Sequence, residues 1–366
     1  MRNLDTPCLI LDEARMMRNV KRLQTRAANL GVALRPHLKT AKSIDVARRT
    51  VQGYSRATVS TVKEAEVFAA SGLQDIIYAV GISPDKLPRI QRLREAGHDV
   101  QVLLDSVQQA NACVTRGVPA FIEIDSDGHR GGLQPDDPKL VEIGKILHAN
   151  ECLKGVLTHA GESYGAAAAE DRIKFAAIER DAALAAARHL TAAEIPCPTV
   201  SVGSTPTAHA ATDLDGVTEL RAGVYMFFDL VMAGIGACKI EDIALSVLTT
   251  VIGHQSDRGW IICDAGWMAL SQDRGTATQD IDQGYGLVCT LDGTLIPELM
   301  VKSANQEHGK IAIRDAASAE LPSLPIGSKL RILPNHACAT AAQHDHYNVL
   351  FSDGKPIAKW PRFNGW

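Results

Sequence analysis

Lys39 is the first residue in this sequence whose type and position suggest chemistry. It ends the first expected strand, in the segment RPHLKT, which also contains Arg35 and His37. A lysine that forms Schiff bases reacts as the neutral amine, and neighbouring cations favour that form. The segment therefore suits a covalent nucleophile at the mouth of a barrel, beside His37 and Arg35. A surface lysine at a strand end is the alternative at this point.

Two glycine-containing turns could bind a phosphate group. The segment VSVGSTPT offers the N–H and hydroxyl groups of Gly203, Ser204 and Thr205, which can donate hydrogen bonds to phosphate oxygens. Taken alone, such a Ser and Thr more often cap a helix. The segment RAGVYMF adds Gly223, which would let the backbone N–H of Val224 approach the same group. Two such turns on adjacent strands favour a phosphate site.

Aromatic and basic side chains could contact a ring-shaped cofactor beside that phosphate. His159 and Tyr164 lie in the segment THAGESYG, and Tyr225 follows the second glycine turn. Such rings can stack on a cofactor or hydrogen-bond to it. Arg130, in DSDGHRGG, could reach a pyridine nitrogen or a substrate carboxylate. From residue type alone, packed core side chains and a solvated loop arginine are the alternatives.

A histidine and a cysteine near the C-terminus could hold a metal ion. His336 and Cys338 are two positions apart in LPNHACATAAQHDHY, so on a strand their side chains would point to the same side. Such a pair suits zinc and leaves coordination positions for water or substrate. A structural Cys–His contact is the alternative. Groups that could support such a site, or could be ordinary surface residues, are His308, His344, Asp345 and His346.

The elements that must position these residues alternate regularly. Helical segments are expected at 12–30, 62–70, 85–96 and 165–193, and short β-rich runs lie between helical segments. The expected strands cover residues 32–38, 56–60, 75–80, 99–104, 120–125, 154–159, 199–203 and 218–222. This alternation predicts an α/β fold, a closed (β/α)8 barrel of the TIM type, although an open doubly wound sheet would give a similar pattern.

In such a barrel the active site forms at the carboxyl ends of the strands. Those ends carry Lys39, Asp105, Asp125, His159, Ser204 with Thr205, and Gly223 with Tyr225. After about residue 240 the pattern becomes mainly β, with strands expected at 245–253, 259–264, 286–291 and 329–333. We therefore expect a barrel domain over 13–240. A β-rich domain over 241–366 is expected to include the N-terminal strand within 1–12.

Composition narrows the class of protein. With 46% hydrophobic and 22% charged residues the 366-residue chain is globular, and a net charge of -4 gives no basic surface for nucleic acid or an anionic membrane. Asp5 and Pro7 interrupt the apolar run near the N-terminus. The run is therefore too short for a signal peptide or a membrane span. Eight scattered cysteines indicate reduced thiols and a cytoplasmic location.

The sequence resembles the D-serine dehydratase and D-threonine aldolase family, whose members share a fold with the N-terminal barrel of alanine racemase. The resemblance rests on DTPCLILD, RPHLKT, HAGESYG, VGSTPT, ELRAGVYMFFD and PNHAC, and it covers nearly the whole chain. It implies pyridoxal 5'-phosphate attached to Lys39 as a Schiff base. It also implies phosphate contacts from Thr205, Gly223 and Val224 and ring contacts from Tyr164. Many relatives have Asn at the position of Val224. Val224 could therefore contact the phosphate through its backbone, but not through its side chain.

The resemblance further implies a divalent metal on His336 and Cys338, which would bind the β-hydroxyl of a D-amino acid substrate. Loss of the α-proton, with Lys39 as base, would release water and give a keto acid and ammonia. Cleavage between Cα and Cβ would instead give glycine and an aldehyde. Relatives are usually dimers, so a homodimer is expected.

The ligand pair favours the first reaction. Dehydratases of the family resemble this chain in having His-x-Cys, whereas the aldolases tend to have His-x-Asp. A thiolate favours zinc, and a carboxylate suits manganese or magnesium. We therefore expect dehydration of D-serine or D-threo-3-hydroxyaspartate. D-threonine aldolase chemistry is the main alternative, and an amino-acid racemase and a non-catalytic carrier of pyridoxal phosphate are the lesser ones.

Overall fold

The computed structural model describes residues 1–166, 168–315 and 320–366. The contacts divide the chain into two compact units. The first, here called the barrel unit, comprises Lys21–Gly223 and Asn364–Trp366, and the second, the β unit, comprises Met1–Val20 and Val224–Phe363. The functional domains expected at 13–240 and 241–366 with 1–12 stay a prediction.

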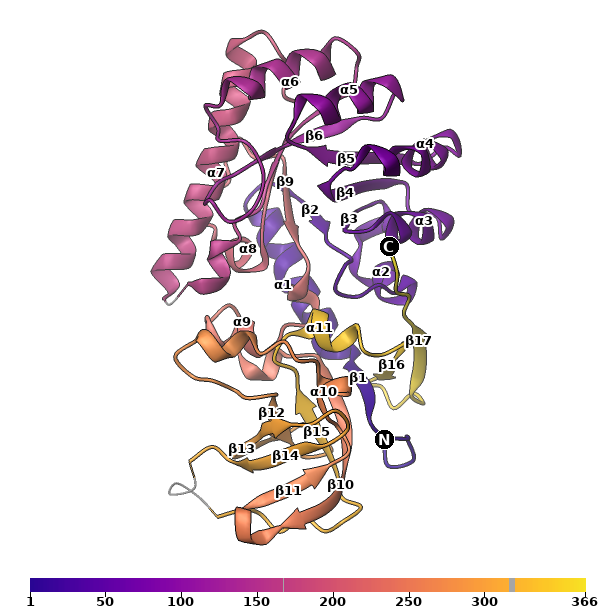
Figure 1. Ribbon diagram of the computed structural model, residues 1–366, viewed down its shortest axis with the longest axis vertical. Coiled ribbons are helices and arrows are strands. Elements are labelled where there is room, and N and C mark those ends of the chain that lie inside the picture. Colours follow the sequence, from indigo (N-terminus) through magenta and orange to yellow (C-terminus); the bar gives the residue numbers. More distant parts are fainter. Residues whose placement is uncertain (167, 316–319) are drawn as a thin grey trace. The chain divides into compact units, whose positions relative to one another are not determined.

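The barrel unit contains eight parallel strands in the order β2-β9-β8-β7-β6-β5-β4-β3 (Figure 1). Their bounds are Ala33–Pro36 (β2), Arg56–Val59 (β3), Asp75–Gly81 (β4), Asp99–Leu104 (β5), Ala120–Ile124 (β6), Leu153–Thr158 (β7), Thr199–Val202 (β8) and Glu219–Ala222 (β9). A parallel bridge between His37 and Thr58 and a hydrogen bond of 2.9 Å from the Leu38 N–H to the Thr58 carbonyl join the first strand to the last. The sheet is therefore closed, which confirms the barrel and excludes the open sheet.

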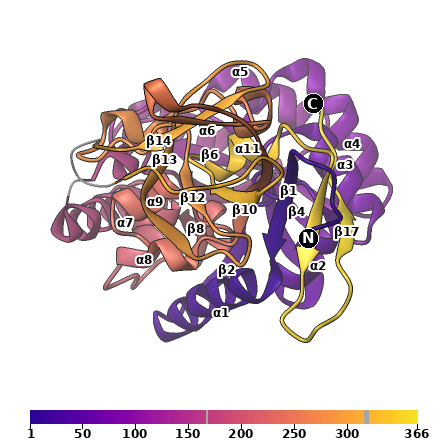
Figure 2. The same ribbon diagram turned by 90° about the horizontal axis from the view of Figure 1, so that it is seen from below.

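Helices follow the strands and surround them on the outside (Figures 1 and 2). They are Ile44–Thr50 (α2), Val62–Ala70 (α3), Leu87–Glu95 (α4), Val107–Thr115 (α5), Pro138–His148 (α6), Ala169–Ala192 (α7) and Thr205–Ala210 (α8). Thr61 caps α3, because its side chain accepts a hydrogen bond of 3.0 Å from the Glu64 N–H. Position 167 of the expected 165–193 helix lies outside the described residues.

The barrel interior contains an ionic network near the amino ends of the strands. The Arg35 guanidinium contacts both carboxylate oxygens of Asp75 at 2.8 Å and one oxygen of Glu219 at 2.8 Å. Asp75 and Glu219 are the first residues of their strands, so Arg35 points toward the amino ends. The expectation that Arg35 lies beside Lys39 at the mouth is therefore wrong, because two carboxylates hold its guanidinium at the opposite end.

The β unit is built on one nine-stranded sheet in the order β11-β14-β13-β12-β15-β10-β1-β16-β17. The strands are Cys8–Asp12 (β1), Leu245–Gln255 (β10), Trp260–Cys263 (β11), Leu287–Cys289 (β12), Leu295–Ala304 (β13), Gly309–Ile313 (β14), Lys329–Leu333 (β15), His346–Leu350 (β16) and Ala358–Pro361 (β17). As expected, β1 belongs to this sheet, where it pairs antiparallel with β10 and parallel with β16. Because β10 also pairs with β11, part of the sheet closes on itself.

The remaining elements are short, except for helix α1 (Glu13–Asn29), which begins in the β unit and ends in the barrel unit. The β unit adds Leu230–Gly234 (α9), Trp267–Leu270 (α10) and Ala337–Ala341 (α11). The 3₁₀ turns are Gln52–Tyr54 (η1), Pro84–Lys86 (η2), Glu162–Gly165 (η3), Val224–Met226 (η4), Ile240–Asp242 (η5), Ser256–Arg258 (η6) and Gly275–Thr278 (η7).

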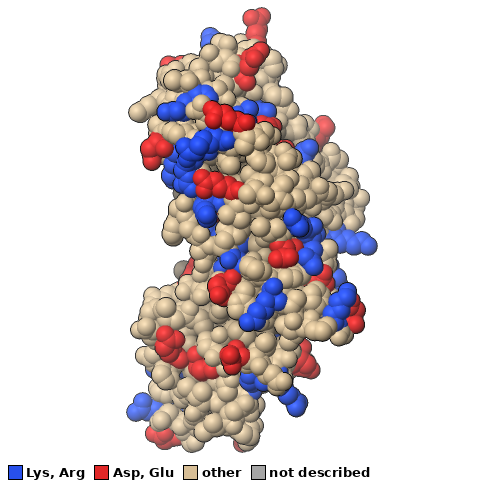
Figure 3. All heavy atoms as spheres, turned by 90° about the vertical axis from the view of Figure 1, so that its right-hand side faces the viewer, with Lys and Arg blue, Asp and Glu red and all other residues tan. Residues whose placement is uncertain are grey.

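Charged side chains of both signs are interspersed on the surface that Figure 3 shows, in keeping with the small net charge of -4. Across the described part of the chain, none of the helices combines the length and the apolar character that a membrane crossing requires.

Candidate active site and metal pair

Lys39 lies just after β2, in the turn that follows the barrel closure, and its side chain is exposed. Its backbone N–H donates to Nδ1 of His37 at 3.4 Å, and Nε2 of His37 lies 3.3 Å from the Ser60 hydroxyl. Burial lowers the pKa of His37 well below its usual value, and the positive charges of Lys39 and Arg221 lower it further. A neutral imidazole therefore stands beside the candidate nucleophile.

His159 lies just after β7, and its Nδ1 also makes a hydrogen bond to the backbone. Its Nδ1 donates to the carbonyl of Gly203 at 3.2 Å, which leaves Nε2 as an acceptor. Burial lowers the pKa of His159 well below its usual value, and Arg130 and Lys39 lower it further. Tyr164 lies on η3, with its ring centroid 6.1 Å from that of His159. The structure therefore brings Lys39, His159 and Tyr164 to the carboxyl end of the barrel.

Arg130 lies on the exposed loop after β6, with one Nη 3.5 Å from the Glu123 carboxylate. Two strand-end carboxylates organise that loop. Asp105 accepts from the Gly132 N–H at 3.1 Å, and Asp125 accepts from the Gly128 N–H at 2.7 Å. Asp105 and Asp125 therefore lie at the barrel mouth, as the sequence predicts. Their hydrogen bonds fix the loop that carries Arg130.

The turn after β8 has the features of a phosphate site. The hydroxyl of Thr205 is buried and has no hydrogen-bond partner among the described residues. A side chain at Gly203, whose φ is +134°, would place its Cβ 2.1 Å from the Arg221 carbonyl, so only glycine fits. The Cβ of a side chain at Gly223 would lie 3.1 Å from the His37 carbonyl. An orphaned donor beside two glycines fits a phosphate group.

The other candidates near this turn have defined surroundings. Ser204 caps α8, accepting from the Thr207 N–H at 3.2 Å, and its hydroxyl lies 2.9 Å from that of Ser163. Val224 and Tyr225 begin η4, in the β unit, and both are buried. The hydroxyl of Tyr225 has no partner in the described part of the chain. Their contacts with a cofactor stay a prediction.

Glu179, on α7, organises the mouth from outside the strands, and sequence reasoning missed it. One carboxylate oxygen accepts from the Ala160 N–H at 3.0 Å and the Gly203 N–H at 2.9 Å. The other oxygen accepts from the Thr207 hydroxyl at 2.7 Å. Burial raises the pKa of Glu179, and these hydrogen bonds act in the opposite direction. No motif or spacing singles out one glutamate in a long helix.

Arg221, the third residue of β9, is the second residue that sequence reasoning missed. Its guanidinium is buried inside the barrel, where Nε donates to the Ser201 hydroxyl at 2.8 Å and one Nη donates to the Thr158 carbonyl. Burial lowers the pKa of Arg221 to about 10. The alternation of β9 could have shown that Arg221 and Glu219 share the inner face. Arg221 therefore adds a buried cation to this end of the barrel, as Glu179 adds a buried carboxylate.

In the β unit, His336 and Cys338 lie at the start of a helix. His336 is the N-cap of α11, Cys338 lies in the first turn, and the two side chains hydrogen-bond to each other. The expectation that they share a strand is wrong, because β15 ends at Leu333 and the segment ACATA favours a helix. The start of α11 is fixed by the Ala337 N–H, which donates to the buried Asp229 carboxylate at 2.8 Å.

Asp273 holds the imidazole of His336 from the other side. Its carboxylate lies 2.6 Å from Nδ1 of His336, so Nε2 and the Cys338 sulfur are the two atoms directed at a ligand. Burial opposes protonation of His336, yet Asp273 and Cys338 outweigh it and raise its pKa to about 11. A site that stabilises positive charge on an imidazole fits a cation.

The metal pair has few further ligands nearby. Over residues 1–166, 168–315 and 320–366, no three side chains of the His, Cys, Asp or Glu type gather in a metal-binding arrangement. Nε2 of His344 donates to the Ala269 carbonyl at 3.0 Å, His346 pairs with Asp345, and His308 is exposed. His344 and His346 thus make hydrogen bonds within the protein, and His308 lies on the surface.

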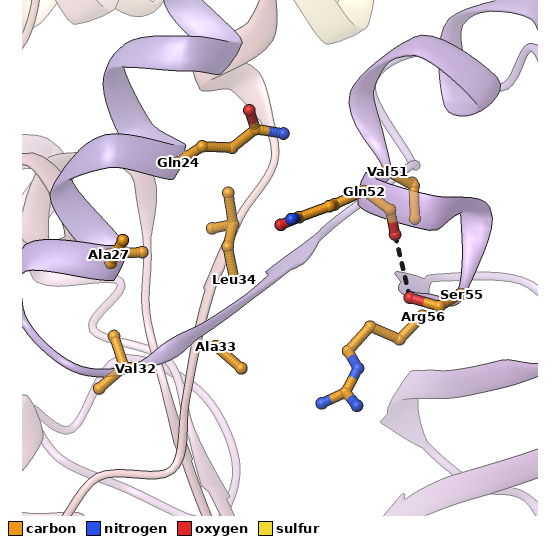
Figure 4. Close-up of a pocket in the computed structure, with 10 residues that line it drawn as sticks. Gln24, Ala27, Val32, Ala33, Leu34, Val51, Gln52, Ser55 and Arg56 are labelled. Carbon is orange, nitrogen blue, oxygen red and sulfur yellow. Dashed lines mark hydrogen bonds between the residues drawn. The ribbon is translucent and has the colours of Figure 1, made fainter.

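A cavity of about 420 Å³ lies at the amino ends of the barrel strands, opposite the mouth (Figure 4). It is lined by α1, the start of β2 and the segment Val51–Arg56, with Gln52 and Arg56 among its polar side chains. None of the candidate residues above lines it. Active sites of β/α barrels lie at the other end, so the mouth is the candidate site.

Known families match both parts of the chain. The family described as "Alanine racemase, N-terminal domain" matches residues 11–231, and the family described as "Putative serine dehydratase domain" matches residues 244–350.

Curated relatives extend the match over the full length. D-threo-3-hydroxyaspartate dehydratase of Delftia sp. is 53% identical over 99% of this chain and 98% of its own. D-serine dehydratase of Dictyostelium discoideum is 29% identical, covering 100% and 98% of the two chains. D-threonine aldolase of Arthrobacter sp. is 30% identical, covering 96% and 90%.

The solved structure of the Delftia dehydratase matches with a TM-score of 0.96 and 51% identity over 100% of this chain and 99% of that one. A structure of a cysteine-to-alanine mutant of the same dehydratase, described as a metal-free form, matches with a TM-score of 0.97 and 52% identity over 100% and 99%. The chain therefore belongs to the family of D-serine dehydratases and D-threonine aldolases, pyridoxal-phosphate-dependent lyases built on the alanine racemase fold.

Proposed function

We propose that this chain is a pyridoxal-phosphate- and metal-dependent dehydratase of D-β-hydroxy amino acids. The proposed substrates are D-threo-3-hydroxyaspartate and D-serine, which would give a keto acid and ammonia. The observation that carries this proposal is the 53% identity, over 99% of the chain, to the D-threo-3-hydroxyaspartate dehydratase of Delftia sp..

The residues proposed to hold pyridoxal phosphate are those of the barrel mouth. Lys39 would carry it covalently, and the orphaned Thr205 hydroxyl would donate to the phosphate beside the backbone of Gly223 and Val224. Gly203, whose own N–H is bonded to Glu179, would contribute by keeping its turn free of a side chain. The other candidates for contacts with it are His159, Tyr164, Ser204, Tyr225 and Arg130. When bound, the cofactor withdraws electrons from the bonds at Cα of an amino acid.

The mouth residues would bind the substrate and move one proton. The Lys39 Nζ would be the base for the α-proton, because their lowered pKa values make His37 and His159 weaker proton acceptors. Arg130 and Arg221, whose charges act on His159, would attract the carboxylate of an amino acid. A second carboxylate, as in hydroxyaspartate, would add to that attraction.

We propose that His336 and Cys338 hold a divalent metal, with zinc favoured by the thiolate and manganese or magnesium as the alternatives. The pairing of Nδ1 with Asp273 supports this assignment, because metal-bound histidines usually donate their other nitrogen to a carboxylate. The metal-free form of the Delftia cysteine mutant also supports it. The metal would serve as the Lewis acid for the leaving β-hydroxyl.

The test is a parallel assay of keto acid, ammonia and glycine from D-threo-3-hydroxyaspartate, D-serine and D-threonine. Keto acid and ammonia in equal amounts, with little glycine, are expected from the first two. Cys338→Ala should keep the visible absorbance of the bound cofactor and lose metal, with keto acid formation falling with the metal content. A racemised amino acid with no keto acid would contradict the dehydratase assignment.

Aldol cleavage is the second candidate, because the Arthrobacter aldolase is 30% identical over 96% of this chain. Glycine with glyoxylate from hydroxyaspartate, or with acetaldehyde from D-threonine, would identify it. Cys338 argues against it, since the aldolases resembled by this chain tend to have Asp there.

We also propose a reducing, cytoplasmic compartment, which the eight free cysteines support. The homodimer expected from the family stays a prediction that sedimentation of the holoenzyme would test.

A further inference from the structure

The β unit contains a buried arginine that lacks a counter-charge. Arg331, in the middle of β15, is only 2% exposed, and its Nε donates to the Ser246 hydroxyl at 2.9 Å. Its Nη2 is buried without any hydrogen-bond partner among the described residues. No carboxylate of the described chain lies within ion-pair distance of it, and residues 167 and 316–319 include no acidic residue.

An unpaired buried guanidinium is costly. Arginine keeps its proton in proteins, so burial cannot neutralise it as it neutralises a lysine or a histidine. Buried charges are therefore paired with an opposite charge or fully hydrogen-bonded in stable proteins. Arg331 meets neither condition with protein groups alone.

A second guanidinium lies beside the first. Arg15, on α1, forms an ion pair of 3.3 Å with Asp12, and one of its Nη atoms approaches the turn between β12 and β13. A Cβ on Gly293 of that turn would lie 2.7 Å from Nη1 of Arg331 and 3.5 Å from Nη2 of Arg15. Nη1 of Arg331 and Nη2 of Arg15 therefore both lie beside Gly293, where any other residue would collide with Arg331.

The acidic groups around this point do not neutralise it. Asp12 is committed to Arg15, whose backbone N–H it also binds at 2.9 Å. Asp292 is exposed, and its carboxylate accepts from Thr290 and Thr294 within its own turn. Cys289, the remaining titratable neighbour, is a buried thiol whose pKa is raised by burial to about 11, so it stays uncharged at neutral pH.

We propose that Arg331 and Arg15 bind a small anion at Gly293. Chloride and phosphate share the necessary chemistry, a compact negative charge that two guanidinium groups can surround. The bound anion would link α1, β10, β15 and the turn between β12 and β13 within the β unit. This site is independent of the dehydratase activity, since none of its residues belongs to the proposed active site or metal pair.

The experiment is a thermal unfolding series on the holoenzyme, saturated with pyridoxal phosphate and zinc. Sodium gluconate is replaced stepwise by sodium chloride at constant ionic strength, and the series is repeated with sodium phosphate. A saturable rise in Tm of about 2 to 4 °C is expected, as for a ligand that binds only the folded state at concentrations well above its dissociation constant. A response to both anions shows a general anion site, and a response to one alone shows which anion it takes.

Arg15→Gln is the variant to compare, because Arg15 is partly exposed and its loss leaves the core intact. It should abolish the saturable rise, whereas Arg18→Gln, on the exposed side of the same helix, should keep it. In crystals soaked in sodium bromide, an anomalous peak should appear between Arg15 and Arg331. An unchanged rise in Arg15→Gln, or a bromide peak only elsewhere, would overturn the proposal.

Discussion

Three histidines of this chain lie in opposite electrostatic surroundings. At the barrel mouth, burial and neighbouring cations lower the pKa values of His37 and His159. In the β unit, Asp273 and Cys338 raise the pKa of His336 to about 11 against the effect of burial. The surroundings of the imidazole thus oppose its protonation in one region and favour it in the other.

The difference teaches what each region is built to hold. The cations that act on His37 and His159 can attract anions, such as a phosphate or a substrate carboxylate. A pair that stabilises a proton on imidazole provides the electron pairs that a metal cation would take instead. The variants below test this division of roles, in order of decreasing effect.

The largest effect is expected from Lys39→Ala at the barrel mouth. It removes both the covalent attachment of the cofactor and the base, so the rate of keto acid formation should fall about 10⁴-fold. The visible spectrum should change at the same time, whereas the metal content should not. Lys63→Ala, on the exposed face of α3, is the control. Loss of metal in Lys39→Ala would show that metal binding in the β unit depends on the cofactor site of the barrel mouth.

A smaller effect is expected from Asp273→Asn in the β unit. An amide orients the imidazole of His336 less well and makes Nε2 a weaker electron-pair donor, so metal affinity should fall about 10- to 100-fold. Rates should recover when excess zinc is supplied, and the cofactor spectrum should not change. Asp280→Asn, an exposed neighbour, is the control. Unchanged zinc affinity would remove Asp273 from the metal site.

Thr205→Val tests the phosphate assignment. It replaces the orphaned hydroxyl by a methyl group of similar size, so the dissociation constant for pyridoxal phosphate should rise about tenfold. The apoenzyme should be at least as stable as the parent, because a buried unpaired hydroxyl is gone. Thr205→Ser should bind the cofactor nearly as well as the parent. Equal affinity in Thr205→Val would show that this hydroxyl does not contact the phosphate.

The smallest effect concerns pH. The folded pKa of His37 is depressed, so the unfolded chain binds more protons and the free energy of unfolding falls as pH drops below about 6.5. His37→Asn should lessen that fall by about 1.4 kcal/mol per pH unit. Urea unfolding between pH 5.5 and 7 measures it, with exposed His308→Asn as the control. A slope that matches the parent would mean that His37 is protonated in the folded protein.

Much of the fold was predictable because the barrel repeats one strongly patterned unit. All eight expected barrel strands are present, since each is a short apolar run bounded by turn residues. The β unit was harder. Strand β13 contains Pro297, which argues against a strand, and β16 and β17 are short and partly polar.

The candidate site was predictable where the chain carries compact motifs. Lys39, His159 and Thr205 each follow a recognisable strand, and the structure places them at one mouth. Glu179 and Asp273 were missed because they act through tertiary hydrogen bonds, and no spacing in the sequence links them to the groups they hold.

The place of β1 in the sheet has a consequence for synthesis on the ribosome. Strand β1 ends at Asp12, whereas its partner β10 begins at Leu245, which is 233 residues later. At cellular rates of about 5 to 20 residues per second, the first strand waits roughly 10 to 50 s for that partner to be made. The intervening barrel can mature in that interval, so a nascent chain would carry a folded barrel with an unpaired, apolar N-terminal strand. That exposed apolar strand is the segment that a chaperone would bind.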